Sequence, residues 1–122
     1  MAMIAAMALA LAATSVDAGT LAATGPARAC LPEAGLRSIE LVGGGRWLMV
    51  QGFGRQRWRS AMAAGCTLPK RPVIISRANI SGQFCERDQI RVSDQITRLF
   101  LTQCAVGPFT PVDLPKGTRL ER

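Results

Sequence analysis

The sequence contains no histidine and no tyrosine among its 122 residues. Without histidine, the Ser-His-Asp and Cys-His nucleophilic arrangements cannot be assembled, and His-based metal catalysis is excluded as well. Glu86 and Asp88 are two positions apart, but the neighbouring Arg87 and Arg91 favour a solvated charged turn over an acid–base pair. We therefore predict a protein that is not an enzyme, with no catalytic residues, no metal site and no cofactor. A histidine-free hydrolase with a carboxylate pair from distant segments is the less favoured alternative.

Charge is absent from the first 16 residues, because no ionisable side chain precedes Asp17. An apolar run followed by Val16-Asp17-Ala18 and then Gly19 is typical of an export signal that is cut after Ala18. A membrane-spanning helix would need about 20 apolar residues, so the run falls short of that alternative. Arg28-Ala29-Cys30 has some likeness to a lipoprotein junction, but an arginine there disfavours it. We predict a signal peptide at 1–18, no transmembrane segment in the mature chain, and a periplasmic or secreted location.

Closely spaced cysteine pairs are also missing. The four cysteines are Cys30, Cys66, Cys85 and Cys104. Structural zinc sites usually take their ligands from Cys-x-x-Cys pairs, whereas an exported chain of this size uses scattered cysteines as disulfides. We therefore predict two disulfide bonds. Four cysteines allow three pairings, and we prefer Cys66–Cys85 with Cys30–Cys104, because the second bond would tie the ends of the domain together.

Short β-type runs separated by glycine and proline turns fill the rest of the chain. The runs cover 36–42, 46–51, 55–63, 73–75, 89–93 and 96–104. Gly43-Gly44-Gly45 between the first two is a hairpin signal, and the stretch from Ser60 to Ala64 could instead be helical. We predict an all-β fold, a small antiparallel meander of five or six strands that closes into a disulfide-stabilised barrel or sandwich. In this division of the chain, 19–29 is a flexible lead-in and 30–122 is a single domain with an irregular, proline-rich C-terminal segment.

The cysteines stand among characteristic neighbours. These are Arg37-Ser38-Ile39, Trp58, Ala64-Gly65-Cys66-x-Leu68, Phe84-Cys85-x-x-Asp88-x-Ile90-x-Val92 and Cys104-x-Val106-Gly107-x-Phe109-Thr110-Pro111-Val112. The pattern, which covers about residues 30–112, resembles a family of small exported bacterial proteins with four cysteines in this order, catalogued as a domain of unknown function. Trp58 stands where the family leads us to expect a tyrosine, and Arg87 where it leads us to expect a glycine. The resemblance implies export and disulfides, and it implies no activity.

Asp88 belongs to the Cys-x-x-Asp frame of that pattern. Its carboxylate could bind a cation or a substrate amine. We favour the alternative that it accepts backbone N–H groups in the turn after Cys85, as aspartate commonly does.

Positive charge is in excess, with 15 basic against 8 acidic residues and a net charge of +7. The candidate anion-binding residues are Arg46, Arg55, Arg57 and Arg59, flanked by Trp47, Phe53 and Trp58. In a strand, alternation places the last three arginines on one side and Trp58 on the other. Arginine suits phosphates and carboxylates, so we predict a basic face for anionic envelope components: lipopolysaccharide phosphates, acidic glycans or released nucleic acid. The alternatives are a polar outer strand face with both tryptophans in the core, and a structural or interaction subunit of an envelope complex.

Overall fold

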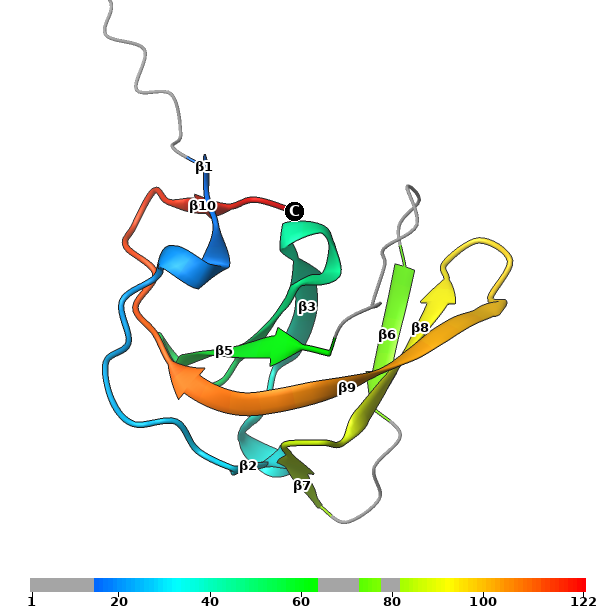
Figure 1. The fold of residues 1–122 in the computed structure, drawn as a ribbon, viewed down its shortest axis with the longest axis horizontal. Coiled ribbons are helices and arrows are strands. Elements are labelled where there is room, and N and C mark those ends of the chain that lie inside the picture. Colours follow the sequence, from blue (N-terminus) through cyan, green and yellow to red (C-terminus); the bar gives the residue numbers. More distant parts are fainter. Residues whose placement is uncertain (1–14, 64–72, 78–81) are drawn as a thin grey trace, which may run out of the picture.

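The computed structural model describes residues 15–63, 73–77 and 82–122, and its main element is one antiparallel sheet with the strand order β3-β4-β5-β9-β8-β6. The strands are β3 (Ser38–Val42), β4 (Trp47–Gln51), β5 (Arg57–Met62), β6 (Val73–Arg77), β8 (Gln89–Asp94) and β9 (Phe100–Pro111). The sheet curls so that its two ends approach each other across the core (Figure 1). The predicted all-β, disulfide-stabilised fold is therefore confirmed.

Three successive glycines make the turn between β3 and β4. Gly43–Gly45 form a short 3-10 turn, η3, in which all three φ angles are positive, between 63° and 89°. Left-handed backbone is costly for a residue with a Cβ and free of that cost for glycine, so this run selects a turn here. The turn sets Val42 opposite Trp47, and the hairpin predicted from the sequence is formed.

Strand β9 is the longest element and joins the two halves of the sheet. Its first half pairs with β8 and its second half with β5. A bulge lets it bend: Gly107 and Pro108 together lie opposite Ala61. A Cβ on Gly107 would come within 2.9 Å of the Ala61 carbonyl oxygen, and a proline without an N–H group is tolerated at a bulge. The proline-rich segment predicted as irregular is therefore a strand as far as Pro111.

Both faces of the β3-β4-β5 meander are covered. The inner face and the facing strands form the first core: Leu31, Leu41, Leu48, Val50, Phe84, Ile90, Val92, Cys104, Val106 and Phe109. The second core lies on the opposite face and consists of Ala18, Leu21, Val42, Met49 and Val112, with Val16, Trp47, Leu114 and Leu120 packed against it. Because Leu41 and Val42 are adjacent and both buried, consecutive residues of β3 serve different cores. The second core is completed by the two ends of the described chain, residues 15–29 and 112–122, which together we call the strap.

The N-terminal half of this strap covers 15–29. It begins with β1 (Ser15–Val16), which pairs in parallel with β10 (Arg119–Leu120), and continues through the 3-10 turn η1 (Ala18–Thr20). Ala18 is 0% and Leu21 8% exposed.

Backbone hydrogen bonds then hold the strap along β9. The Thr24 N–H donates to the Pro111 carbonyl at 2.9 Å, and Arg28 and Phe109 exchange two bonds of 2.8 Å each. Residues 19–29, which the sequence predicts as a flexible lead-in, are thus packed against the sheet. The physical reason is that the apolar outer face of β3 and β4 needs a cover, and Leu21 supplies part of it.

A second, two-stranded sheet closes the lower end of the first core (Figure 1). It pairs β2 (Cys30–Pro32) with β7 (Gln83–Cys85) and is followed after β2 by the 3-10 turn η2 (Glu33–Gly35). Leu31 and Phe84, both fully buried, plug the opening, and the Phe84 ring lies 5.0 Å from that of Phe109, centroid to centroid.

The same pairing sets Cys30 directly opposite Cys85, and these two cysteines form a disulfide. The preferred pairing of Cys66 with Cys85 and Cys30 with Cys104 is therefore wrong. The positions of the cysteines along the chain do not reveal the register of β2 on β7, which decides that the sulfurs of Cys30 and Cys85 meet. Cys104 is also disulfide-bonded, and Cys66 lies outside the described residues.

Candidate anion-binding groove

Strand β5 presents its side chains alternately to its two faces. Ser60 is fully buried, and its hydroxyl donates to the Gly107 carbonyl at 2.9 Å, while Trp58 packs against the first core. Arg57 and Arg59 lie on the opposite face, as the alternation predicts. Arg55 precedes the strand in the turn after β4. The four arginines singled out in the sequence nevertheless do not make one surface.

Arg59 lies under the strap and serves the fold. Its Nη1 donates to the carbonyls of Ala18 at 3.0 Å, Gly19 at 3.3 Å and Leu21 at 2.7 Å. The guanidinium carbon also sits 5.5 Å from the centroid of the Trp47 ring. A cation committed to three carbonyls and an aromatic face has little left to offer a ligand.

Arg46 is committed in a similar way, though on the surface. Its Nε donates to the Gly43 carbonyl at 2.8 Å and its Nη2 lies 3.5 Å from the Asp17 carboxylate. The arginine side chain is 65% exposed, so this ion pair adds little stability. Arg46 and Arg59 therefore leave the predicted anion-binding set.

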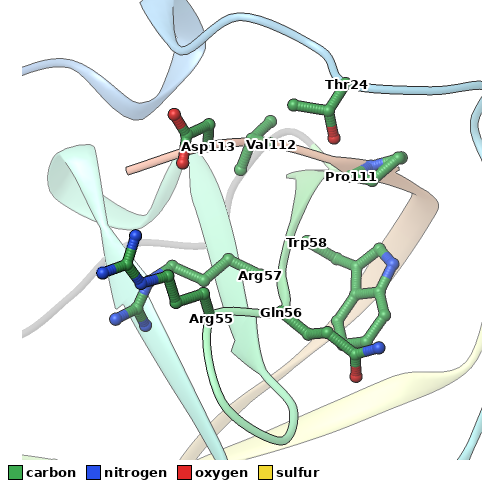
Figure 2. Close-up of a pocket in the computed structure, with 8 residues that line it drawn as sticks. All are labelled: Thr24, Arg55, Gln56, Arg57, Trp58, Pro111, Val112 and Asp113. Atoms are coloured by element: carbon green, nitrogen blue, oxygen red, sulfur yellow. The ribbon is translucent and has the colours of Figure 1, made fainter. Parts of the chain in front are cut away.

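Arg55 and Arg57 remain, and both line the same groove (Figure 2). The groove has a volume of about 490 Å³, and its lining consists of Thr24, Arg55, Gln56, Arg57, Trp58, Pro111, Val112 and Asp113. In Figure 2 the two guanidinium groups point in the same direction, away from the indole of Trp58. Within the described part of the chain, neither guanidinium has a hydrogen-bond or ion-pair partner.

A second groove of about 360 Å³ adjoins the first and shares Arg55, Arg57 and Asp113 with it. Its remaining wall is the segment from Leu114 to Thr118, which includes Lys116. Three basic residues and one acidic residue thus line the two adjoining grooves. The surplus of positive charge makes these two grooves a candidate site for an anion.

The far wall of the first groove is apolar. Trp58 and Pro111 lie opposite each other in the sheet register, and Val112 continues that wall. The Gln56 amide and the Thr24 hydroxyl add neutral hydrogen-bonding groups. One end of the groove can therefore neutralise an anion while the other accepts an apolar or ring-shaped part of the same ligand.

Lys116, Asp113 and Thr24 were not among the residues singled out from the sequence. They come from the tail and from the supposed lead-in, both of which read as irregular. The proline and glycine around Lys116 signal a turn but give no indication that this turn folds back beside Arg57.

Asp88 takes the structural role that we favoured. Its Oδ2 accepts the Cys85 N–H at 2.7 Å, and its own N–H donates to the Cys85 carbonyl at 3.0 Å. Arg87 in the same turn has a φ of 71°, a left-handed conformation that glycine adopts without strain. Glu86 and Asp88 thus lie at a turn, as their arginine neighbours indicated.

Acidic residues are sparse in the grooves. Asp113 is the carboxylate of the two grooves described above, and Glu40 that of a third, smaller one lined in part by Arg57. Among the residues described, no cluster of three potential metal ligands is found. Over the same ranges, no helix has the length and apolarity to cross a bilayer.

Comparison with models of known families, with curated proteins and with solved structures found no match. The resemblance to four-cysteine exported proteins therefore stays a prediction, and the groove has to be interpreted from its own chemistry.

Proposed function

We propose that this protein is an exported, non-enzymatic binding module of the cell envelope that takes an anionic ligand in the groove of Arg55 and Arg57. The observation that carries the proposal is that both guanidinium groups line both connected grooves while no described residue pairs with them. Two unpaired guanidinium groups on one wall attract an anion. The other two candidates, Arg46 and Arg59, already donate hydrogen bonds to backbone carbonyls.

Export is supported by the covalent structure. The Cys30–Cys85 disulfide and the disulfide of Cys104 would persist in an oxidising compartment and be reduced in a cytosol. Together with the uncharged run before Asp17, they support a periplasmic or secreted location.

The ligand class follows from the groove walls. Arginine forks bind phosphate and carboxylate oxygens in pairs, while Trp58 and Pro111 offer an apolar surface on which a sugar ring can lie. A volume of about 490 Å³ is in the range of small-molecule sites. We therefore favour a phosphorylated or carboxylated saccharide, as in lipopolysaccharide or an acidic glycan.

The experiment compares two double variants that remove the same charge. The first variant, Arg55→Gln with Arg57→Gln, removes both arginines of the groove. The second, Arg28→Gln with Arg91→Gln, removes two exposed arginines elsewhere. A hydrogen bond to a charged group contributes about 1.5–3 kcal/mol, so the groove variant should bind a short heparin oligosaccharide at least about tenfold more weakly by calorimetry.

The control variant should keep most of the affinity, and glucosamine 6-phosphate should compete with heparin for the unaltered protein. Binding should weaken steeply as salt rises. Equal losses in the two double variants would show that net charge, and not this groove, attracts the polyanion, and the assignment would fail.

A further inference from the structure

The loop between β8 and β9 exposes large apolar side chains at its tip. In the loop, Ile96 is 72% and Leu99 64% exposed, and Leu101, the second residue of β9, is 43% exposed. In Figure 1 this loop (yellow to orange) projects from the end of the sheet beyond the neighbouring strands. Single exposed apolar residues are ordinary on protein surfaces, but three within six positions, two of them in one projecting loop, are a local concentration of exposed apolar side chains.

The tip is held in shape by the residue at its base. Asp94 is buried, and its Oδ1 accepts the N–H groups of Ile96 at 2.8 Å and Thr97 at 3.2 Å. The backbone of Asp94 adds two bonds, from its N–H to the Leu99 carbonyl at 2.9 Å and from the Arg98 N–H to its own carbonyl at 2.8 Å. The loop is therefore built to hold Ile96 and Leu99 outward.

The charge around the tip has one sign. Arg98, at the tip, and Arg91, on β8, are both exposed. From residue 89 to residue 105 the sequence has one acidic residue, Asp94, and its carboxylate is buried under the loop. The projecting surface thus combines apolar side chains with arginine and presents no exposed carboxylate over those residues.

We propose that this hairpin tip docks on an anionic lipid bilayer, with Ile96 and Leu99 entering the interface and Arg98 near the lipid phosphates. Apolar residues that enter the headgroup region beside basic residues that meet anionic lipid are the combination by which proteins attach to a membrane surface. Arginine can keep its guanidinium at the phosphate level while its aliphatic stem follows the apolar residues inward.

A second copy of this chain is a poorer occupant. A two-fold contact through the tip would bring the same surface of both copies together, and with it the arginines of both copies. Like charges that face each other across an interface repel, whereas an anionic membrane surface attracts the arginines of the tip.

The tip is independent of the proposed groove. It lies at the N-terminal end of β9, while the groove lies at the C-terminal end around Pro111, and a strand of that length extends up to about 35 Å. The two sites can therefore be altered separately.

The test is partitioning onto vesicles of phosphatidylglycerol mixed with phosphatidylcholine, measured by co-sedimentation and compared with pure phosphatidylcholine. The variant Ile96→Gln with Leu99→Gln should reduce partitioning onto the mixed vesicles at least about tenfold, because each apolar side chain loses its transfer to the interface. Phe53→Gln, which removes an apolar side chain that is 58% exposed from another turn, should leave it unchanged. Coincident thermal unfolding curves would show that the exposed substitutions preserve the fold.

Penetration is read separately with Ile96→Trp. Its fluorescence should shift to the blue and be quenched by brominated acyl chains more than that of the parent protein with Trp47 and Trp58. Absence of vesicle binding by the parent, or unchanged partitioning of the tip variant, overturns the proposal. So does binding that is lost with Arg55→Gln and Arg57→Gln alone, which would leave the groove function standing. Concentration-dependent dimerisation that the tip variant abolishes, without vesicle binding, would assign the tip to a second copy instead.

Discussion

The Arg59 guanidinium donates a 3.0 Å hydrogen bond to the Ala18 carbonyl, across 41 positions of sequence. This bond joins the middle of β5 to the residue after which the predicted export cut would fall. It also separates the arginines of β5 by role, because Arg57, two residues earlier on the same face, lines the grooves.

Arg59→Gln should destabilise the protein, and Arg57→Gln should not. Glutamine cannot reach all three strap carbonyls, so we expect the free energy of unfolding to fall by about 2–3 kcal/mol, measured in urea. Arg57→Gln removes the same charge from the same face and should stay within about 0.5 kcal/mol of the parent. Equal effects of the two substitutions would contradict the separation of roles.

Removing the first part of the strap should weaken the fold. A chain that starts at Gly19 lacks Val16 and the buried Ala18, and it places a new α-ammonium group beside Arg59. We expect it to be less stable by about 2–3 kcal/mol than a chain that starts at Ser15. Deleting the exposed Arg122 is the matched control and should change little. Identical melting temperatures for the chains starting at residues 15 and 19 would show that this part of the strap is dispensable.

Disulfide mapping should recover a peptide pair joined through Cys30 and Cys85. A non-reducing tryptic digest analysed by mass spectrometry distinguishes it from the pairing that we preferred from sequence, Cys66–Cys85 with Cys30–Cys104. Replacing Cys30 and Cys85 together by serine opens a loop of 55 residues and should cost about 2–4 kcal/mol. A digest in which Cys85 is linked to any other cysteine would refute the register of β2 on β7.

Arg87→Gly should stabilise the protein slightly. A residue with a Cβ loses about 1–2 kcal/mol in the left-handed region, part of which glycine gives back through its larger unfolded-state entropy, so we expect a gain of about 0.5–1 kcal/mol. Arg91→Gly on β8, where the backbone is extended, is the control, and it should lower the free energy of unfolding by a similar amount. Destabilisation at both positions would mean that the Arg87 side chain makes contacts that outweigh its backbone strain.

Local sequence signals predict the six strands of the main sheet, but they miss the short strands β1, β2, β7 and β10 and the second half of β9. Ile90 and Val92 alternate with polar neighbours and are both fully buried in β8, and the glycines at 43–45 form the turn expected of them. Ile96 is the instructive exception. It belongs to an apolar run that predicts a strand, but Asp94 turns its backbone into a loop, and the isoleucine ends up in solvent.

The sequence by itself determined the all-β class, the hairpin at Gly43–Gly45 and the alternation along β5, because these depend on residues within a few positions of each other. The tertiary structure alone decided which cysteines meet, which apolar residues of 15–29 are needed as a cover, and which arginines stay available. Those outcomes depend on partners tens of residues away: Cys85 for Cys30, and the Ala18 carbonyl for Arg59. The residues around an arginine in the sequence do not show whether its guanidinium faces solvent or donates to distant backbone carbonyls.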